Sequence, residues 1–304
     1  MEKTSGYISA HDGLRLYFER IGDGHAAVIF PNGIYLRDAF CRFAANRTLV
    51  FYDVRNRGRS DAVSDAGKRK SAILKDVADL EAVRCHFASP QISVVGHSYM
   101  GLVVALYAMT FPENVHRVVQ LSPIGPHPGK AYPPYLKWSD GVMAEVSGRI
   151  AKLREEQSSL GAQALCEQFW TLLRAIYVFD PVHAEKIQWG RCDLPNERGF
   201  MKYWTEDIFP SIQSLNLAPA DFARGTAPTL IVHGTKDRSA AYGGARDWAM
   251  LLPNARLITL DDVSHAPWIE AADEVSLATQ AFLNGEWPES AEVVQTLEPK
   301  PRTN

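Results

Sequence analysis

The fold is decided by the stretch Val94-Val95-Gly96-His97-Ser98-Tyr99-Met100-Gly101, which places a serine between a strand and a helix. The apolar residues up to Val95 are typical of a core strand, and the run 102–108 continues at once as a helix. A turn this tight forces its central residue to a positive φ and exposes the serine hydroxyl. Gly96 has the small size that such close backbones need, and Met100 does not. Ser98 is therefore a candidate nucleophile, although a serine that only caps the helix would fit the same residues.

The composition describes a chain that can bury a large core. It has 304 residues, 46% of them hydrophobic, and a formal net charge of −3. There is no basic run, no apolar run of about eighteen residues and no leader-like N-terminus. The four cysteines, Cys41, Cys85, Cys166 and Cys192, lie far apart, so neither a metal site nor a disulfide framework is expected and we interpret them as thiols. We expect a cytoplasmic protein with a small-molecule substrate, no cofactor or metal, and no membrane or nucleic-acid partner; the oligomeric state is left open.

Short apolar runs alternate with helical patterns over most of the chain, which predicts an α/β fold with a mostly parallel sheet. The expected strands are 14–21, 26–30, 48–52, 92–95, 117–121, 229–232 and 256–260, and the expected helices are 36–45, 72–87, 99–111, 243–252 and 274–283. Between about 124 and 226 only helical runs are found, at 140–156, 162–177, 197–209 and after Asp180. We therefore predict a core made of 1–123 and 227–287, an inserted helical segment at 124–226, and a loose tail at 288–304.

Two further residues could activate Ser98. A serine hydroxyl needs a histidine base that a carboxylate holds in the right tautomer. Asp237 follows the expected strand 229–232 and His265 follows the expected strand 256–260, so both lie on loops at the end of a parallel sheet where active sites are found. Each could instead be an ordinary loop residue. The nearby acids Asp261 and Asp262 are too close to His265 in sequence to reach the far nitrogen of its ring.

Together these motifs resemble those of the α/β-hydrolase superfamily. The stretch around Ser98 is similar to its nucleophile elbow, with Met100 in place of a glycine, and the order Ser98, Asp237, His265 is also the order found there. The segment 53–60 resembles its Asp-x-Arg-Gly-x-Gly-x-Ser turn, with Asn56 at the first glycine position. The resemblance implies an eight-stranded type of sheet, mostly parallel and flanked by helices, with the insertion 124–226 forming a helical cap.

The resemblance also implies an oxyanion hole made of backbone N–H groups. One is the N–H of Tyr99, the residue after the nucleophile, and the other is that of Ile34. Ile34 lies in the segment 31–35, which resembles the family's His-Gly-x segment with Asn32 in place of histidine. We expect Asn32, Gly33 and His97 to support the site, because the side chain of His97 should point away from Ser98.

The insertion is rich in aromatic residues, which predicts a partly apolar pocket beneath it. Trp138, Trp170, Tyr203 and Trp204 are the candidates for its lining. Packing of the insertion onto itself would use the same residues.

The sequence favours a serine hydrolase that acts by acyl transfer on small to medium, partly apolar carboxylic esters. An aminopeptidase resembling proline iminopeptidase is an alternative, in which Glu197, Glu206 and Asp207 would bind a free amine, although a solvated surface is the more ordinary role of these acids. A C–C bond hydrolase or cofactor-free perhydrolase would use the same triad, whereas epoxide hydrolases and haloalkane dehalogenases need aspartate in place of Ser98. A ligand-binding protein or receptor without turnover is the alternative outside the enzymes, and Met100 and Asn32 would favour it.

Overall fold

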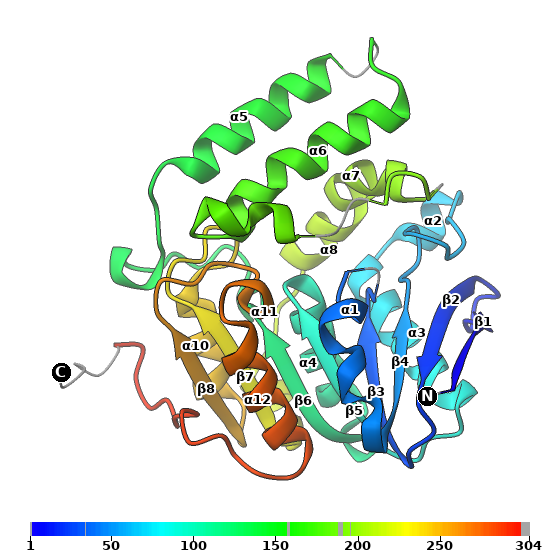
Figure 1. Cartoon of the computed structure of the whole chain (residues 1–304), viewed down its shortest axis with the longest axis vertical. Coiled ribbons are helices and arrows are strands. Elements are labelled where there is room, and N and C mark those ends of the chain that lie inside the picture. Colours follow the sequence, from blue (N-terminus) through cyan, green and yellow to red (C-terminus); the bar gives the residue numbers. More distant parts are fainter. Residues whose placement is uncertain (1, 34, 157–158, 188–190, 195, 299–304) are drawn as a thin grey trace.

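One mixed sheet organises the chain (Figure 1). The computed structural model describes residues 2–33, 35–156, 159–187, 191–194 and 196–298. The eight strands are β1 (Lys3–Ser9), β2 (Arg15–Ile21), β3 (Ala26–Pro31), β4 (Arg47–Tyr52), β5 (Ile92–His97), β6 (Val115–Leu121), β7 (Thr229–Gly234) and β8 (Ala255–Leu260), in the order β1-β2-β4-β3-β5-β6-β7-β8. The pairs β1/β2 and β2/β4 are antiparallel and the remaining neighbours are parallel, so the expected mostly parallel sheet is confirmed.

Helices cover both faces of the sheet. In Figure 1, α1 (Arg37–Phe40) and α12 (Ala272–Leu283) lie in front, and α3 (Ala72–His86), α4 (Tyr99–Thr110) and α10 (Tyr242–Leu251) lie behind. Because both faces are covered, β4, β5 and β7 are buried along their whole length, which explains their mostly apolar sequences. The expected helix 36–45 divides into α1 and a 3-10 turn at Cys41–Asn46. The short helices α2 (Ala66–Arg69), α9 (Pro219–Arg224) and α11 (Pro267–Glu270) are additions to the predicted set.

A second group of helices, which we call the cap, lies over one end of the strands (Figure 1) and falls within residues 124–226. It contains α5 (Val142–Glu155), α6 (Ala162–Tyr177), α7 (Phe200–Tyr203) and α8 (Phe209–Gln213). The expected helix 197–209 is interrupted, because a π-helical turn at Trp204–Ile208 separates α7 from α8. Asp180 accepts a hydrogen bond from the N–H of Val182 and so caps the 3-10 turn Pro181–Lys186. None of the helices in the described part of the chain has both the length and the apolar composition needed to cross a bilayer.

The interpretation of all four cysteines as thiols is wrong for two of them. Cys166 on α6 and Cys192 form a disulfide with a Cα to Cα distance of 5.9 Å, whereas Cys41 and Cys85 are free. The bond joins α6 to the segment before Glu197, and the Cys166 sulfur lies 3.8 Å from the backbone oxygen of Glu197. Spacing in the sequence gives no sign of this pair, because the folding of the cap brings the two residues together.

The segment 288–298, expected to be part of a loose tail, packs against the core. Glu292 forms a β-bridge with Leu257 of β8, and Ala291 and Val294 are buried. Arg246 on α10 donates hydrogen bonds to the backbone oxygens of Thr296, Leu297 and Glu298. Proline and charged residues suggested a loose segment, but the bridge to β8 and the donors of a buried arginine fix its backbone.

Candidate active site

Ser98 occupies a strained turn between β5 and α4. Its φ is 58° and its ψ is −122°, so it has the positive φ that the sequence predicts for this turn. A Cβ atom on Gly96 would lie 2.2 Å from the backbone oxygen of Met100, and a Cβ on Gly101 would lie 2.9 Å from the Cβ of Pro123. The two glycines therefore allow the close approach. The side chain of Met100 is fully buried, and the absence of a side chain on Gly96 leaves room for the backbone of Met100.

Asp237 and His265 lie side by side in the buried interior. The Nδ1 atom of His265 is 2.8 Å from Oδ2 of Asp237, and both side chains are fully buried. The other oxygen of Asp237 accepts hydrogen bonds from the backbone N–H groups of Ser239 (2.7 Å) and Ala240 (2.8 Å). The Nε2 atom of His265 is buried without a hydrogen-bond partner among the described residues. The imidazole therefore donates from Nδ1 and keeps a lone pair on Nε2, which is the tautomer that a general base requires.

A second histidine, His233 at the end of β7, also contacts Asp237. Its Nε2 atom lies 3.1 Å from Oδ2 of the carboxylate. Burial raises the pKa of Asp237, but the electrostatic interaction with His265 and hydrogen bonds from His233 and His265 outweigh it, so the net pKa lies below the ordinary value of 3.8. Asp237 therefore stays ionised at neutral pH. The sequence analysis did not identify His233, although its position four residues before Asp237 is visible in the sequence.

His97 joins two loops through its ring nitrogens. Its Nε2 atom lies 2.9 Å from the backbone oxygen of His265, which can only accept, so Nε2 carries the hydrogen. Nδ1 must then accept from the hydroxyl of Tyr35, which is 3.1 Å away. Burial and then the charge of His265 lower the pKa of His97 well below its usual 6.5. A neutral His97 thus positions the loop of His265 against the loop of Tyr35.

The residues expected to form the oxyanion hole are described in part. Tyr99 is the first residue of α4, so its N–H has no partner within the helix. Ile34 lies outside the described residues. Asn32 is buried at a φ of 60°, and its amide nitrogen lies 3.3 Å from the hydroxyl of Tyr35. A Cβ on Gly33 would lie 2.5 Å from the Cβ of Phe51, so this loop needs glycine in order to lie against β4.

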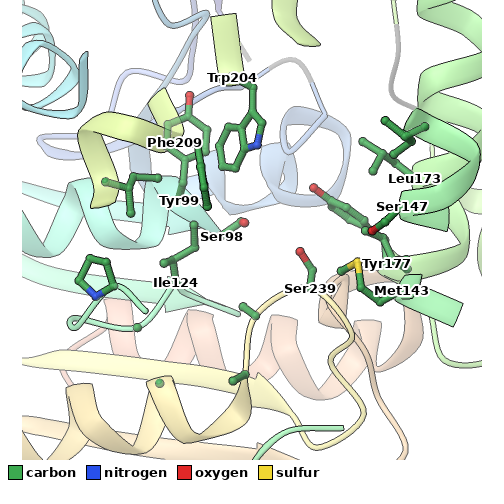
Figure 2. Close-up of a pocket in the computed structure, with 18 of the residues that line it drawn as sticks. Ser98, Tyr99, Ile124, Met143, Ser147, Leu173, Tyr177, Trp204, Phe209 and Ser239 are labelled. Carbon is green, nitrogen blue, oxygen red and sulfur yellow. The ribbon is translucent and has the colours of Figure 1, made fainter. Parts of the chain in front are cut away.

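A cavity of about 520 Å³ lies between the cap helices and the turn at Ser98 and Tyr99. Figure 2 shows the Ser98 hydroxyl directed into this space, with Ser239 and Tyr177 across it. Trp170 and Trp204 line the cavity, and so do residues that the sequence analysis did not assign to it: Tyr35, Arg57, Phe169, Tyr177, Phe200 and Phe209. On α6, the spacing of Phe169, Leu173 and Tyr177 is a helical stripe that could have identified this wall.

Two of the four expected lining residues lie elsewhere. Tyr203 is buried beside the cavity and does not line it. Trp138 packs against the ammonium group of Lys236, 3.6 Å from the ring centre, and its Nε1 donates to Asp140 at 3.2 Å. These contacts hold Trp138 outside the cavity, so the aromatic content of the cap overstated the number of lining residues.

The three acids considered as amine ligands all have cationic neighbours. Glu197 accepts hydrogen bonds from Nε and Nη2 of Arg57 at 3.1 and 2.7 Å, Asp207 lies 3.1 Å from Arg69, and Glu206 lies 4.0 Å from Lys202. Glu197 is 1% exposed, so the expectation of a solvated acid is wrong for this residue. Glu197 is instead buried in an ion pair with Arg57 of the turn at 53–60, where the core meets the cap.

Asp76 on α3 is a buried carboxyl group that the sequence analysis did not identify. Neither of its oxygens has a hydrogen-bond partner in the part of the chain that the structure describes. Burial, and then the charge of Asp79, raises its pKa well above the usual 3.8.

We expect Asp76→Asn to remove one source of pH-dependent stability. Because folding raises the pKa of Asp76, its stabilising contribution is full below pH 3.8 and is lost as the pH rises through the folded-state pKa. The variant should therefore gain stability relative to wild type between about pH 4 and pH 7. Urea unfolding at both values measures this gain, and an equal difference at the two values would contradict the assignment.

Comparison with known proteins places the chain in a family. The family model of the alpha/beta hydrolase fold matches residues 28–272. A protein of Pseudomonas syringae named as a carbamate hydrolase, RutD, is 26% identical over 262 residues, which is 83% of this chain and 90% of the relative. Lipase 1 of Psychrobacter immobilis is 23% identical over 251 residues, 81% of this chain and 73% of that protein.

The fold has a solved counterpart in an esterase from Exiguobacterium antarcticum. The two superpose with a TM-score of 0.70 at 16% identity, over 93% of this chain and 100% of the esterase. Since the family model spans most of the chain, the protein belongs to the alpha/beta hydrolase fold family.

Proposed function

We propose that the protein is a serine hydrolase that transfers acyl groups through Ser98, His265 and Asp237, and that its substrates are small to medium, partly apolar carboxylic esters. The observation that carries the proposal is a serine at positive φ, with its hydroxyl directed into a cavity, in a fold that also holds a buried His265–Asp237 pair. Within this proposal, residues 1–123 and 227–287 form the catalytic core and 124–226 the cap.

The proposed reaction has two halves. Ser98 Oγ attacks the ester carbonyl while His265 Nε2 takes its proton, and Asp237 stabilises the imidazolium that forms. The N–H groups of Tyr99 and Ile34 would bind the oxyanion. His265 then protonates the leaving alcohol, which leaves an acyl group on Ser98. A water molecule, deprotonated by His265, attacks that acyl group and releases the carboxylic acid, and the proton returns to Ser98.

The choice of an ester rests on the cavity and on the relatives. Aromatic and aliphatic side chains supply much of the lining, and a volume of about 520 Å³ suits a small to medium substrate. The names of the relatives include an esterase, a lipase and a carbamate hydrolase. Esters and carbamates are both hydrolysed by attack at a carbonyl carbon. The aminopeptidase alternative lacks support, because the described cavity lining contains no carboxylate to receive an amine.

A cytoplasmic location stays a prediction, and the disulfide between Cys166 and Cys192 weighs against it. Disulfides form and persist in oxidising compartments and are rare in the cytosol. Fractionation of the native host tests the location directly.

Labelling with a fluorophosphonate tests the proposed function. The probe should react with the wild-type protein and leave Ser98→Ala unlabelled, and methyl butanoate should be hydrolysed faster than proline β-naphthylamide. Absence of labelling on folded wild-type protein would refute the hydrolase proposal and favour a binding protein. Labelling accompanied by turnover of the naphthylamide alone would favour the aminopeptidase.

A further inference from the structure

The charged residues that line the cavity have one sign. Arg57, Lys130 and Arg154 line it, and the described lining includes no aspartate or glutamate. Arg154 lies at the exposed rim, where its Nη2 donates to Thr205 at 2.9 Å. A cavity lined in this way attracts negative charge and disfavours positive charge.

The carboxylates that balance two of these cations lie behind them. Asp247 is buried and binds Lys130 at 2.7 and 2.8 Å, and Glu197 is buried and binds Arg57. Neither acid is part of the cavity lining. Each ion pair therefore presents its positive end to the cavity, and since Coulomb energy falls with distance, a ligand that contacts the cation experiences a net attraction for an anion.

Arg57 is the cation best placed to act on a substrate. It is 2% exposed and shares the cavity wall with Ser98 and Tyr99. Its guanidinium carbon lies 4.1 Å from the ring centre of Phe200 and 5.0 Å from that of Trp170. Nε and Nη2 are the nitrogens that bind Glu197, and the guanidinium also has a side-chain hydrogen bond with Tyr35, another residue of the cavity lining. Aromatic surroundings lower the local polarity and strengthen the effect of this charge.

We propose that Arg57 gives the cavity a preference for esters that carry a carboxylate group, such as half-esters of short dicarboxylic acids. The inference rests on the proposed function, because it names the substrate class of the same site. Arg57 is then a specificity-determining residue, and Glu197 sets the strength of its charge.

Three methyl esters of similar size test the preference. They are monomethyl glutarate, methyl pentanoate and the methyl ester of 4-(trimethylammonio)butanoate, which are anionic, neutral and cationic. We expect kcat/KM to fall in that order, by about tenfold per step at low salt, and the differences to shrink as ionic strength rises. Equal values for the anionic and neutral esters would overturn the proposal.

A matched pair of variants tests the role of Arg57. Glu197→Gln keeps the shape of the side chain but removes the negative charge behind Arg57, so the ratio of kcat/KM for the anionic ester to that for the neutral ester should rise. Asp79→Asn removes the equivalent carboxylate from Arg55, whose Nε and Nη2 bind Asp79 at 2.7 and 2.6 Å and which does not line the cavity. Both variants should unfold at lower temperature, but only Glu197→Gln should change the ratio. An unchanged ratio in a folded Glu197→Gln protein would show that Arg57 is only a structural partner.

Binding measurements separate this inference from the proposed function. Calorimetry with Ser98→Ala, which retains Arg57, should show tighter binding of monomethyl glutarate than of methyl pentanoate even if the wild-type protein hydrolyses neither. Tighter binding without turnover would support the inference and refute the hydrolase proposal. Turnover of both esters without any preference would support the hydrolase proposal and refute the inference about Arg57.

Discussion

Ser98→Ala should lower kcat for an ester substrate by about 10⁴-fold to 10⁶-fold, the largest effect that we expect from a single substitution. Without Oγ no acyl-enzyme can form, and the oxyanion donors and the cavity can only assist direct attack by water. Gas-tight pH-stat assays with methyl butanoate, at enzyme concentrations high enough to detect the residual rate, give the ratio. Circular dichroism confirms that the variant folds, which is expected because alanine removes a single oxygen atom.

Ser239→Ala is the matched control for this substitution. Ser239 also lines the cavity and lies across it from Ser98 (Figure 2), and its contact with Asp237 is made by the backbone N–H, which alanine retains. We expect a loss of less than about tenfold. Similar losses in the two variants would mean that Ser98 is not the nucleophile.

Asp237→Asn should lower kcat by about 10⁴-fold. The neutral amide no longer stabilises the imidazolium. If its NH2 group faces His265 Nδ1, that nitrogen must accept, the ring hydrogen moves to Nε2, and Nε2 can no longer accept the Ser98 proton. In the wild-type protein the lowered pKa of Asp237 contributes stability above pH 3.8, which is lost as the pH falls below that value. The variant should therefore lose activity at neutral pH and also show a flatter acid unfolding profile.

Asp262→Asn is the control for this second substitution. Asp262 lies three residues before His265 and has a side chain that is 74% exposed, 3.8 Å from Lys236. Its replacement should change kcat by less than about twofold. A comparable loss of kcat in the two variants would contradict the assignment of Asp237 as the acid of the site.

Much of the sheet could be predicted because burial on both faces leaves short, mostly apolar runs in the sequence. The expected strand 48–52 corresponds to β4, and the expected helix 162–177 has the same bounds as α6. β1 could not be predicted this way, because its residues are mostly exposed and owe their conformation to pairing with β2. The helical pattern of 197–209 hid the π-helical turn, which depends on local backbone geometry and not on hydrophobic spacing.

The candidate site shows the same division. Ser98, Asp237 and His265 could be named because each follows a strand that the sequence predicts, and because their order in the chain is the order found in the family. Arg57 and Glu197 could not, because 140 residues separate them and only the placement of the cap on the core makes them partners. Neither the turn at 53–60 nor the segment around Glu197 gives a sign in the sequence that an ion pair joins them beside the cavity.

The disulfide between Cys166 and Cys192 affects the unfolded chain as well as the folded one. It closes a loop across a sequence separation of 26 residues, and the conformational entropy removed from the unfolded state is worth about 3.5 kcal/mol at 25 °C. Single domains are commonly stable by only about 5–15 kcal/mol. Reduction would therefore return freedom chiefly to the cap, while the contacts of the sheet are kept, so the integrity of the cavity depends on the redox state of the surroundings.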